Sequence, residues 1–204
     1  DVPVAVGQSV TVSEDASVFI TLTGTDIEGQ PLTYEVVSNP GHGVLSGTAP
    51  NLTYKPNSNY HGADIFTFTA SDGTDVSAVQ TFDLTVTGVN DVPTFTKGGD
   101  QSVLEDAVTQ TVSNWASAIS PGSAEETNQN VTFLVTNSRN ALFSIQPGIN
   151  AASGDLTYRP AAHANGTATV TVSLKDDGGT ANGGVDTSSS QTFTITVTGV
   201  NDAP

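Results

Sequence analysis

Carboxylates are the side chains best placed to do chemistry in this chain. The 204 residues contain 21 Asp and Glu but only 5 Lys and Arg, so the formal net charge is -16. The acids gather at the ends of strand-like runs, in matching places of the two halves of the chain. These places are Glu14-Asp15 and Glu105-Asp106, Asp26 with Glu28 and Glu125-Glu126, Asp72 and Asp176-Asp177, and Asn90-Asp91 and Asn201-Asp202.

Clustered oxygen ligands of this kind suit a hard divalent cation. Ca²⁺ takes about six to eight oxygens, and carboxylates that gather without a cation repel one another. A single acid at a strand end is an ordinary turn residue, as Asp72 or Asp176 would be alone. The set as a whole therefore predicts cation binding, whereas no single member does.

The composition excludes several classes of function. A strongly negative field repels nucleic acid and anionic lipid and attracts cations, so we expect neither nucleic-acid binding nor membrane insertion. The absence of Cys excludes disulfides and thiolate metal sites. No apolar run approaches the roughly 20 residues of a membrane helix.

The sequence does not predict an enzyme. It contains no nucleophile elbow, zinc-protease motif or phosphate loop. His61 and His163 occupy matching loops, which indicates a loop feature of a repeat and not a catalytic pair. The acids lie at domain tips, where a sugar-cleaving cleft would be hard to form. The glycine-rich run 178–186 lacks the spacing of an EF-hand loop and is interpreted as a long flexible hairpin loop.

Internal repetition divides the chain in two. The run Thr87-Gly-Val-Asn-Asp-Val-Pro93 returns as Thr198-Gly-Val-Asn-Asp-Ala-Pro204, and each copy follows a strand-like run. Further landmarks recur in the same order between these copies, among them Leu52-Thr-Tyr-Lys-Pro56 and Leu156-Thr-Tyr-Arg-Pro160. We therefore predict two domains, residues 1–91 and residues 92–204.

The landmarks alternate apolar and polar residues, which is typical of half-buried strands. Turn residues separate them, and helical periodicity is almost absent. This pattern predicts an all-β chain of two tandem antiparallel Greek-key β-sandwiches, about seven strands each, arranged as an elongated rod. The longer second domain should carry its extra length in loops at 121–130, 146–155 and 177–190. Trp115 is expected in its core, on an irregular strand.

Four patterns occur in a family-like order. They are an early Glu, an Asp-x-acidic-Gly run before Leu-Thr-Tyr, a strand closing in Ala-x-Asp-Gly, and an Asn-Asp-x-Pro linker. In these features the chain resembles cadherin repeats, most closely the bacterial cadherin-like, Ig-like tandem repeats of large extracellular adhesins and secreted multidomain proteins. The resemblance covers essentially the whole chain.

The resemblance implies Ca²⁺ at the junctions between consecutive sandwiches. The ligands of the internal junction would be Glu14, Asn90, Asp91, Glu125 or Glu126, and Asp176. Asp26, Glu28 and Asp72 would form half a site at the amino end, and Glu105, Asn201 and Asp202 half a site at the carboxyl end. Gly88 and Gly199 stand where cadherin linkers usually have a further Asp, which implies one ion per junction instead of three, or a weaker site.

The expected function is that of a spacer in a large bacterial surface or secreted protein, with calcium stiffening each joint. Its expected partners are the neighbouring repeats and a cell-surface or matrix glycan or protein, and the segment is expected to be a monomer. An alternative is a calcium-dependent carbohydrate-binding module attached to a polysaccharide-active protein, for which Tyr60 is the one plausible exposed ring. Homophilic adhesion, as in animal cadherins, is a third class.

Overall fold

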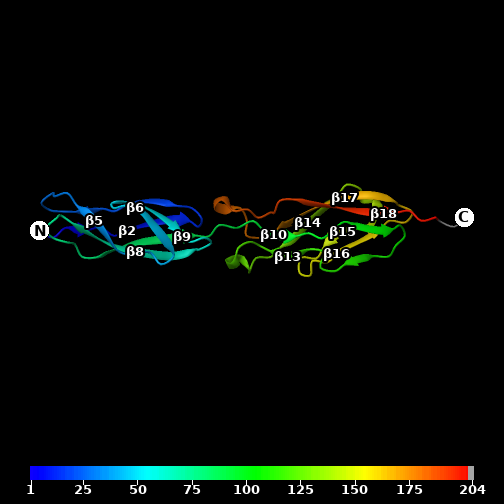
Figure 1. The fold of residues 1–204 in the computed structure, drawn as a ribbon, viewed down its shortest axis with the longest axis horizontal. Helices are drawn as coiled ribbons and strands as arrows, with labels where there is room; N and C mark the ends of the chain where they lie inside the picture. Colours follow the sequence, from blue (N-terminus) through cyan, green and yellow to red (C-terminus); the bar gives the residue numbers. More distant parts are fainter. Residues whose placement is uncertain (202–204) are drawn as a thin grey trace. The chain divides into compact units, whose positions relative to one another are not determined.

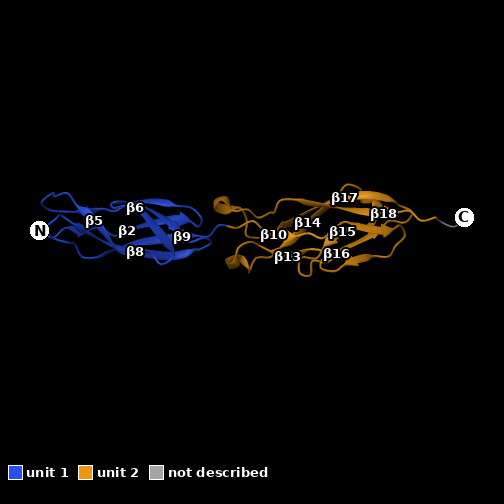
Figure 2. Cartoon of the chain, in the orientation of Figure 1, with its two compact units in different colours: residues 1–89 blue, residues 90–204 orange. Residues whose placement is uncertain are grey.

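A computed structural model of the chain describes residues 1–201. The described residues form two compact units, one of residues 1–89 and one that begins at residue 90 (Figure 2). Asp202, one of the candidate calcium ligands, lies outside the described residues. Each unit is an all-β sandwich, as the alternating pattern predicts (Figure 1). None of the helices in the described part is long and apolar enough to cross a membrane.

Unit 1 is built from two main sheets and a short accessory pair. One sheet has the order β2-β9-β8-β5, the other has the order β3-β7-β6, and β1 pairs with β4. The strands are β1 Val4–Ala5, β2 Gln8–Ser13, β3 Val18–Thr21, β4 Gly24–Thr25, β5 Thr33–Ser38, β6 Gly43–Thr48, β7 Asn51–Pro56, β8 Gly62–Ser71 and β9 Gln80–Thr87.

Unit 2 repeats this order with three added 3-10 turns. Its sheets are β11-β18-β17-β14, β12-β16-β15 and the pair β10-β13. The elements are β10 Thr94–Thr96, β11 Gln101–Leu104, β12 Gln110–Val112, β13 Ser117–Ser120, η1 Ala124–Glu126, β14 Thr132–Asn137, η2 Asn140–Leu142, β15 Phe143–Ile149, β16 Leu156–Pro160, β17 Gly166–Lys175, η3 Ala181–Gly183 and β18 Gln191–Thr198.

The first two strands of each unit are split between sheets. In unit 1, β1 pairs with β4 whereas β2 pairs with β9, so the segment that begins the sandwich contributes to two sheets. The pairs β2–β9 and β11–β18 are parallel, and all other pairs in the described residues are antiparallel. The sandwich class is confirmed, with one parallel pair per unit that the alternation did not predict.

Burial follows the alternation. In β9, Phe82, Leu84 and Val86 are buried while Thr81 and Thr85 are exposed. Burying large apolar side chains in this way is the main stabilising contribution to each unit. The core of unit 1 is formed by Ala5, Val12, Ile20, Leu22, Leu52, Tyr54, Phe66, Phe68, Ala70, Phe82, Leu84 and Val86.

Trp115 lies in the core of unit 2, as expected. Its side chain is 3% exposed, its indole N–H donates to the Gly99 carbonyl at 2.9 Å, and its ring lies against Phe193. Trp115 does not lie on a strand, however: it lies in the bend between β12 and β13, where the backbone of Asn114 takes a positive φ of 51°. Of the loops predicted to be longer, 121–130 contains η1 and 177–190 contains η3, whereas the prediction for 146–155 was wrong in its first part, because β15 runs to Ile149.

Candidate metal centre

Asn90 fastens the start of unit 2 to the loop after β17. Its side-chain amide donates to Asp176 Oδ1 and to the Val185 carbonyl, both at 3.0 Å, and its Oδ1 accepts from Gln129 Nε2 at 2.8 Å. The Asn90 carbonyl also accepts from the Val185 N–H at 2.9 Å. This linker residue is therefore held to unit 2 by protein contacts alone.

Asp176 is the most deeply buried of the candidate ligands in unit 2, with 3% exposure. It follows β17, and its backbone N–H donates to the Asp186 carbonyl. Its Oδ1 accepts from Asn90 and from the Gly178 N–H at 2.9 Å. Its Oδ2 is buried and accepts no hydrogen bond among the described residues. Such an atom costs free energy unless a donor or a cation reaches it.

The adjacent acids Glu125 and Glu126 on η1 have different surroundings. Both oxygens of Glu126 bind the backbone: Oε2 accepts from the Ser123 N–H at 3.1 Å, and Oε1 accepts from the Asp91 N–H at 2.9 Å. Glu125 Oε1 is buried and accepts no hydrogen bond within the described part of the chain. The carboxylate of Glu126 therefore accepts hydrogen bonds from the backbone, whereas Glu125 has an oxygen that a ligand could use.

Two glycines make this close arrangement possible. A Cβ on Gly178 would collide with the Asn90 side chain and with Gln129 Nε2, and a Cβ on Gly122 would collide with Glu126 Oε2. Both positions therefore require the absence of a side chain. The glycine-rich run is not the featureless hairpin loop that its composition suggests, because it packs against the linker residue Asn90.

Asp177 has a structural role in unit 2. Its two oxygens accept from the side chain and the backbone N–H of Asn130, each at 2.8 Å. These two hydrogen bonds lower the pKa of Asp177. They also join the loop before β14 to the end of β17, so the candidate ligand Asp176 stands on a fixed turn.

Glu14 and Glu105 occupy equivalent places at the carboxyl ends of the two units. Glu14 is buried and accepts from the Val89 N–H, and Glu105 is buried and accepts from the Val200 N–H at 2.8 Å. The backbone N–H of each Glu also donates to the last residue of the final strand. Both side chains therefore close the parallel strand pair of their unit onto the segment that follows it.

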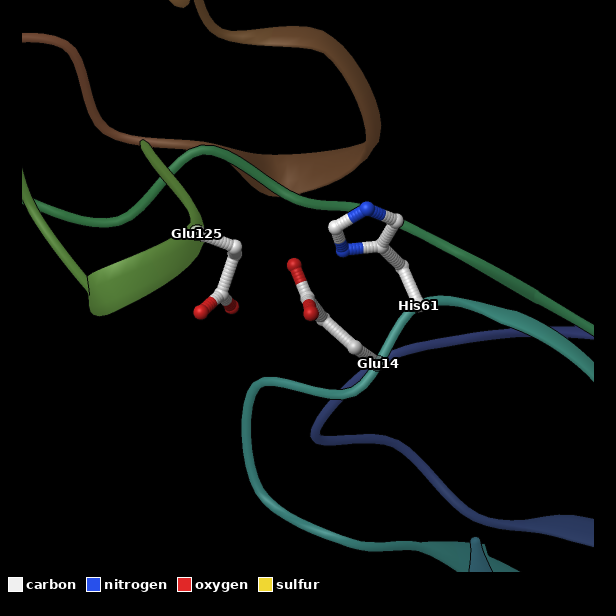
Figure 3. Close-up of side chains that lie close together, drawn as sticks. All are labelled: Glu14, His61 and Glu125. Atoms are coloured by element: carbon white, nitrogen blue, oxygen red, sulfur yellow. The ribbon is translucent and has the colours of Figure 1, made fainter. Parts of the chain in front are cut away.

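The His61 ring lies next to Glu14. Figure 3 shows the His61 ring beside the Glu14 carboxylate, and their ligand atoms lie within 4.8 Å of each other. In unit 2 the matching position is Asn165, since Gly62 and Gly166 both begin ten-residue strands with positive φ. His163 instead matches Asn59, and both have φ near 55–58°. The two histidines therefore lie in matching loops but at different positions of those loops.

Asn201, a candidate ligand at the carboxyl end, is exposed.

The acids at the amino end of unit 1 are engaged in local turns. Asp26 Oδ1 accepts from the Glu28 and Gln30 N–H groups, and Glu28 Oε2 pairs with the amino group of Asp1 at 2.9 Å. Asp72 Oδ1 accepts from two backbone N–H groups of its own turn, and these bonds lower the pKa of Asp72. Asp26, Glu28 and Asp72 do not converge as a set within 4.8 Å among the described residues.

The fit to calcium is best at the Asn90 end of unit 2. Four buried oxygens without a hydrogen-bond partner in the described residues belong to this end: Asp176 Oδ2, Glu125 Oε1, Gln129 Oε1 and the hydroxyl oxygen of Ser123. They are hard oxygen ligands of the type that Ca²⁺ prefers. The carboxylates of Asp91, Glu125, Glu126 and Asp176 do not include three that meet within 4.8 Å in the described structure. An ion would therefore have to draw side chains inward.

Sequence reasoning missed a second buried carboxylate, Asp64 in unit 1. Its oxygens accept from the N–H groups of Gly41, His42 and Ile65, each at 2.9 Å, and from the Tyr54 hydroxyl at 2.8 Å. It is 5% exposed. The signal was available, because Asp64 stands in register with Phe66 and Phe68 and must face inward in a period-2 strand. With every oxygen occupied, Asp64 is structural.

Comparison with known proteins identifies the class of domain. Residues 1–85 match the family model described as bacterial Ig domain. No curated protein matches the chain. Among solved structures, the chain is similar to human protocadherin-24 EC1-2 in its form II, with 18% identity and a TM-score of 0.65 over 96% of this chain and 98% of that one. A second structure of human protocadherin-24 EC1-2 has 17% identity to this chain and a TM-score of 0.60, over 98% of this chain and 98% of that one.

The human mucin-like protocadherin EC1-2 is also similar, at 14% identity and a TM-score of 0.51 over 97% of this chain and 98% of that one. At these identities the likeness shows the fold alone. Together with the family match, it confirms the predicted resemblance to bacterial cadherin-like repeats with an Ig-like sandwich. Domains of these kinds are typically extracellular and non-enzymatic.

Proposed function

We propose that this chain is a structural segment of a large bacterial surface or secreted adhesin, and that it binds Ca²⁺ at the Asn90 end of unit 2. The observation that carries the proposal is the buried Asp176 Oδ2, which has no hydrogen-bond donor among the described residues. Asp176 and Glu125 would supply carboxylate oxygens and Gln129 an amide oxygen. Glu14, Asn90 and Asp91 are further ligands that the resemblance implies.

Hydrogen bonds within the protein hold this end of the unit in place without an ion. Asn90 and Glu126 hold the linker backbone, and Asp177 fixes the turn that carries Asp176. A bound Ca²⁺ would supply the positive charge that offsets the repulsion between the remaining carboxylates. Because binding to the folded state alone stabilises it by mass action, the ion would also make the joint stiffer.

The carbohydrate-binding alternative gains no specific support from the aromatic side chains. The Tyr60 ring stacks on His42 at a centroid distance of 4.1 Å and an interplanar angle of 2°. Its hydroxyl donates to the Ala63 carbonyl at 2.6 Å. Tyr60 is therefore packed on one face and fastened at its tip, which does not favour it as a sugar platform.

The direct test is a calorimetric titration of the full chain with CaCl₂, after treatment with EDTA. Extracellular calcium modules bind with a Kd of about 0.1–1 mM, so we expect binding in this range. Asp176→Asn and Glu125→Gln should each weaken it. Asp83→Asn is the control, because Asp83 is exposed on β9 and its replacement changes the net charge equally.

Thermal melting in calcium and in EDTA supplies a second measurement. At a calcium concentration of 100 times Kd, linkage predicts a gain of about 2.7 kcal/mol for the unit that holds the ion. Equal affinity in the wild type and Asp176→Asn would place the ion elsewhere. No binding at millimolar calcium would leave a spacer without metal.

A further inference from the structure

The loop between β17 and β18 presents an Asn-Gly pair in an unusual conformation. Asn182 has φ 56° and ψ 20°, and Gly183 has φ 95°. Both residues are exposed, and no atom lies within 4 Å of the place where a Cβ of Gly183 would stand. No described residue holds the Asn182 side chain by a hydrogen bond. We propose that Asn182-Gly183 is a site of spontaneous deamidation in the folded protein.

The reaction needs only the chain and water. The backbone nitrogen of Gly183 loses its proton and attacks Cγ of Asn182, so a new N–Cγ bond forms. The bond from Cγ to Nδ2 breaks, and the side-chain nitrogen leaves as ammonia with the proton that the backbone gave up. Water then opens the cyclic imide at one of its two carbonyls, which yields Asp or isoaspartate. No oxidant, reductant or metal takes part.

Local freedom decides the rate, because ψ of Asn182 must rotate to bring the Gly183 nitrogen to Cγ. Residues 183 and 184 are both Gly, which accept almost any backbone conformation. The Gly184 N–H to Ala181 carbonyl bond closes the turn; Ala181, Asn182 and Gly183 are exposed, whereas Gly184 is buried against Asn90. Opening such a loop costs far less than opening a strand.

The other Asn-Gly pair of the chain, Asn165-Gly166, serves as an internal comparison. Gly166 is the first residue of β17 and stands opposite Val197 of β18. A Cβ on Gly166 would collide with the guanidinium of Arg139, so this backbone is also covered. Rotation at Asn165 would pull Gly166 out of the sheet. We therefore expect Asn165 to react at least about tenfold more slowly than Asn182 in the native state.

The two Asp-Gly pairs are restrained as well. Isomerisation of Asp through the same imide proceeds from the neutral carboxyl group, whose hydroxyl can leave as water. The backbone N–H groups of Asp75 and Thr74 lower the pKa of Asp72, and Asn130 lowers the pKa of Asp177. In addition, the Gly178 nitrogen already donates its proton to Asp176. Asn182 is thus the residue most open to this chemistry.

The product would disturb the linker anchor. Val185, three residues after Asn182, forms backbone and side-chain hydrogen bonds with Asn90. Isoaspartate inserts a methylene group into the main chain just before this contact, and either product adds a negative charge to the connection between β17 and β18, which already carries Asp176 and Asp177. Modification should therefore loosen Asn90, independently of whether the site binds calcium.

The experiment is peptide mapping by mass spectrometry after ageing the full chain in mildly alkaline buffer, once folded and once in concentrated urea. Replacement of the amide by a carboxyl group gives the mass gain, and isoaspartyl methyltransferase labelling identifies isoaspartate. In the folded chain, we expect modification at Asn182 at least about tenfold faster than at Asn165. In urea, the two sites should react at similar rates.

Two further measurements complete the test. Asn182→Gln should abolish the fast modification, because the longer side chain forms the ring poorly, and Asn165→Gln should leave it unchanged. In the aged protein, amide exchange at Val185 should be faster than in fresh protein. Equal native rates at Asn182 and Asn165, or an Asn182 rate as strongly suppressed by folding as that of Asn165, would overturn the proposal.

Discussion

The Asn90 side chain donates to Oδ1 of Asp176 at 3.0 Å, across 86 positions of sequence. This hydrogen bond joins the linker at the start of unit 2 to the end of β17. The acceptor is a carboxylate, and hydrogen bonds to carboxylates are stronger than typical neutral hydrogen bonds. A residue that the sequence presents as part of a linker is thus part of the fold of unit 2.

Asn90→Ala should destabilise unit 2 because it removes three side-chain hydrogen bonds and leaves the Asp176 carboxylate with a single donor. We expect the free energy of unfolding to fall by about 2 kcal/mol. Urea unfolding followed by tryptophan fluorescence measures it, since Trp115 is the only Trp and lies in the core of unit 2.

The control for this variant is Asn201→Ala. Asn201 occupies the same place in the second copy of the linker sequence and is exposed. Its replacement should change the free energy of unfolding by less than about 0.5 kcal/mol. Equal losses for the two variants would contradict the anchoring role of Asn90.

Variants of the adjacent residues Glu125 and Glu126 should distinguish a structural role from a role in ligand binding. In EDTA, Glu126→Ala is expected to lower the stability of unit 2 by about 1–2 kcal/mol, because the N–H groups of Ser123 and Asp91 lose their acceptor. Glu125→Ala should have almost no effect in EDTA but should weaken calcium binding. The same urea titrations, repeated with calcium, decide the matter. A larger loss for Glu125→Ala in EDTA would reverse the assignment.

Gly178→Ala tests the packing of the loop on the linker. The new Cβ would collide with the Asn90 side chain and with Gln129. Relieving such overpacking costs about 1–3 kcal/mol, and the Trp115 signal of unit 2 should report it. Gly99→Ala is the matched control, because no atom lies within 4 Å of its Cβ position. Similar stabilities of the two variants would show that the loop does not press on Asn90.

Much of the fold could be predicted from the sequence because alternation reports burial directly. The inward side chains of β9 and β18 follow the pattern residue by residue. Alternation says nothing about which strand lies beside which, however, so the parallel pairs β2–β9 and β11–β18 were not predicted. The split of the first strand between sheets depends on tertiary pairing and leaves no mark on the period.

The candidate site was only partly accessible to sequence reasoning. Residue type and order selected Asp176 and the Glu125-Glu126 pair, but could not show that Glu126 is bound to the backbone while Glu125 is not. That difference depends on the path of the chain at Asp91. Gln129 was missed because a single amide side chain in a polar loop gives no pattern.

Asp64 should make the stability of unit 1 depend on pH. Burial raises the pKa of Asp64, but the hydrogen bonds from Tyr54 and from the backbone of His42, Gly41 and Ile65 outweigh it, so the pKa lies below its ordinary value. Stabilisation by a carboxylate with a lowered pKa is fully present above the unfolded-state value of about 3.9 and is lost as the pH falls through the folded-state value. The free energy of unfolding of unit 1 should therefore fall in acid.

Asp64→Ala measures this contribution. It leaves the Tyr54 hydroxyl and three backbone N–H groups without their acceptor, so we expect a loss of about 3 kcal/mol at neutral pH. The free energy of unfolding of unit 1 should also fall less steeply in acid in the variant than in the wild type. Amide hydrogen exchange in β8 measures it. Unit 2 is an internal control, because Ala168 stands at the matching position and Trp115 reports its unfolding. An unchanged acid profile in Asp64→Ala would assign the pH dependence to other carboxylates.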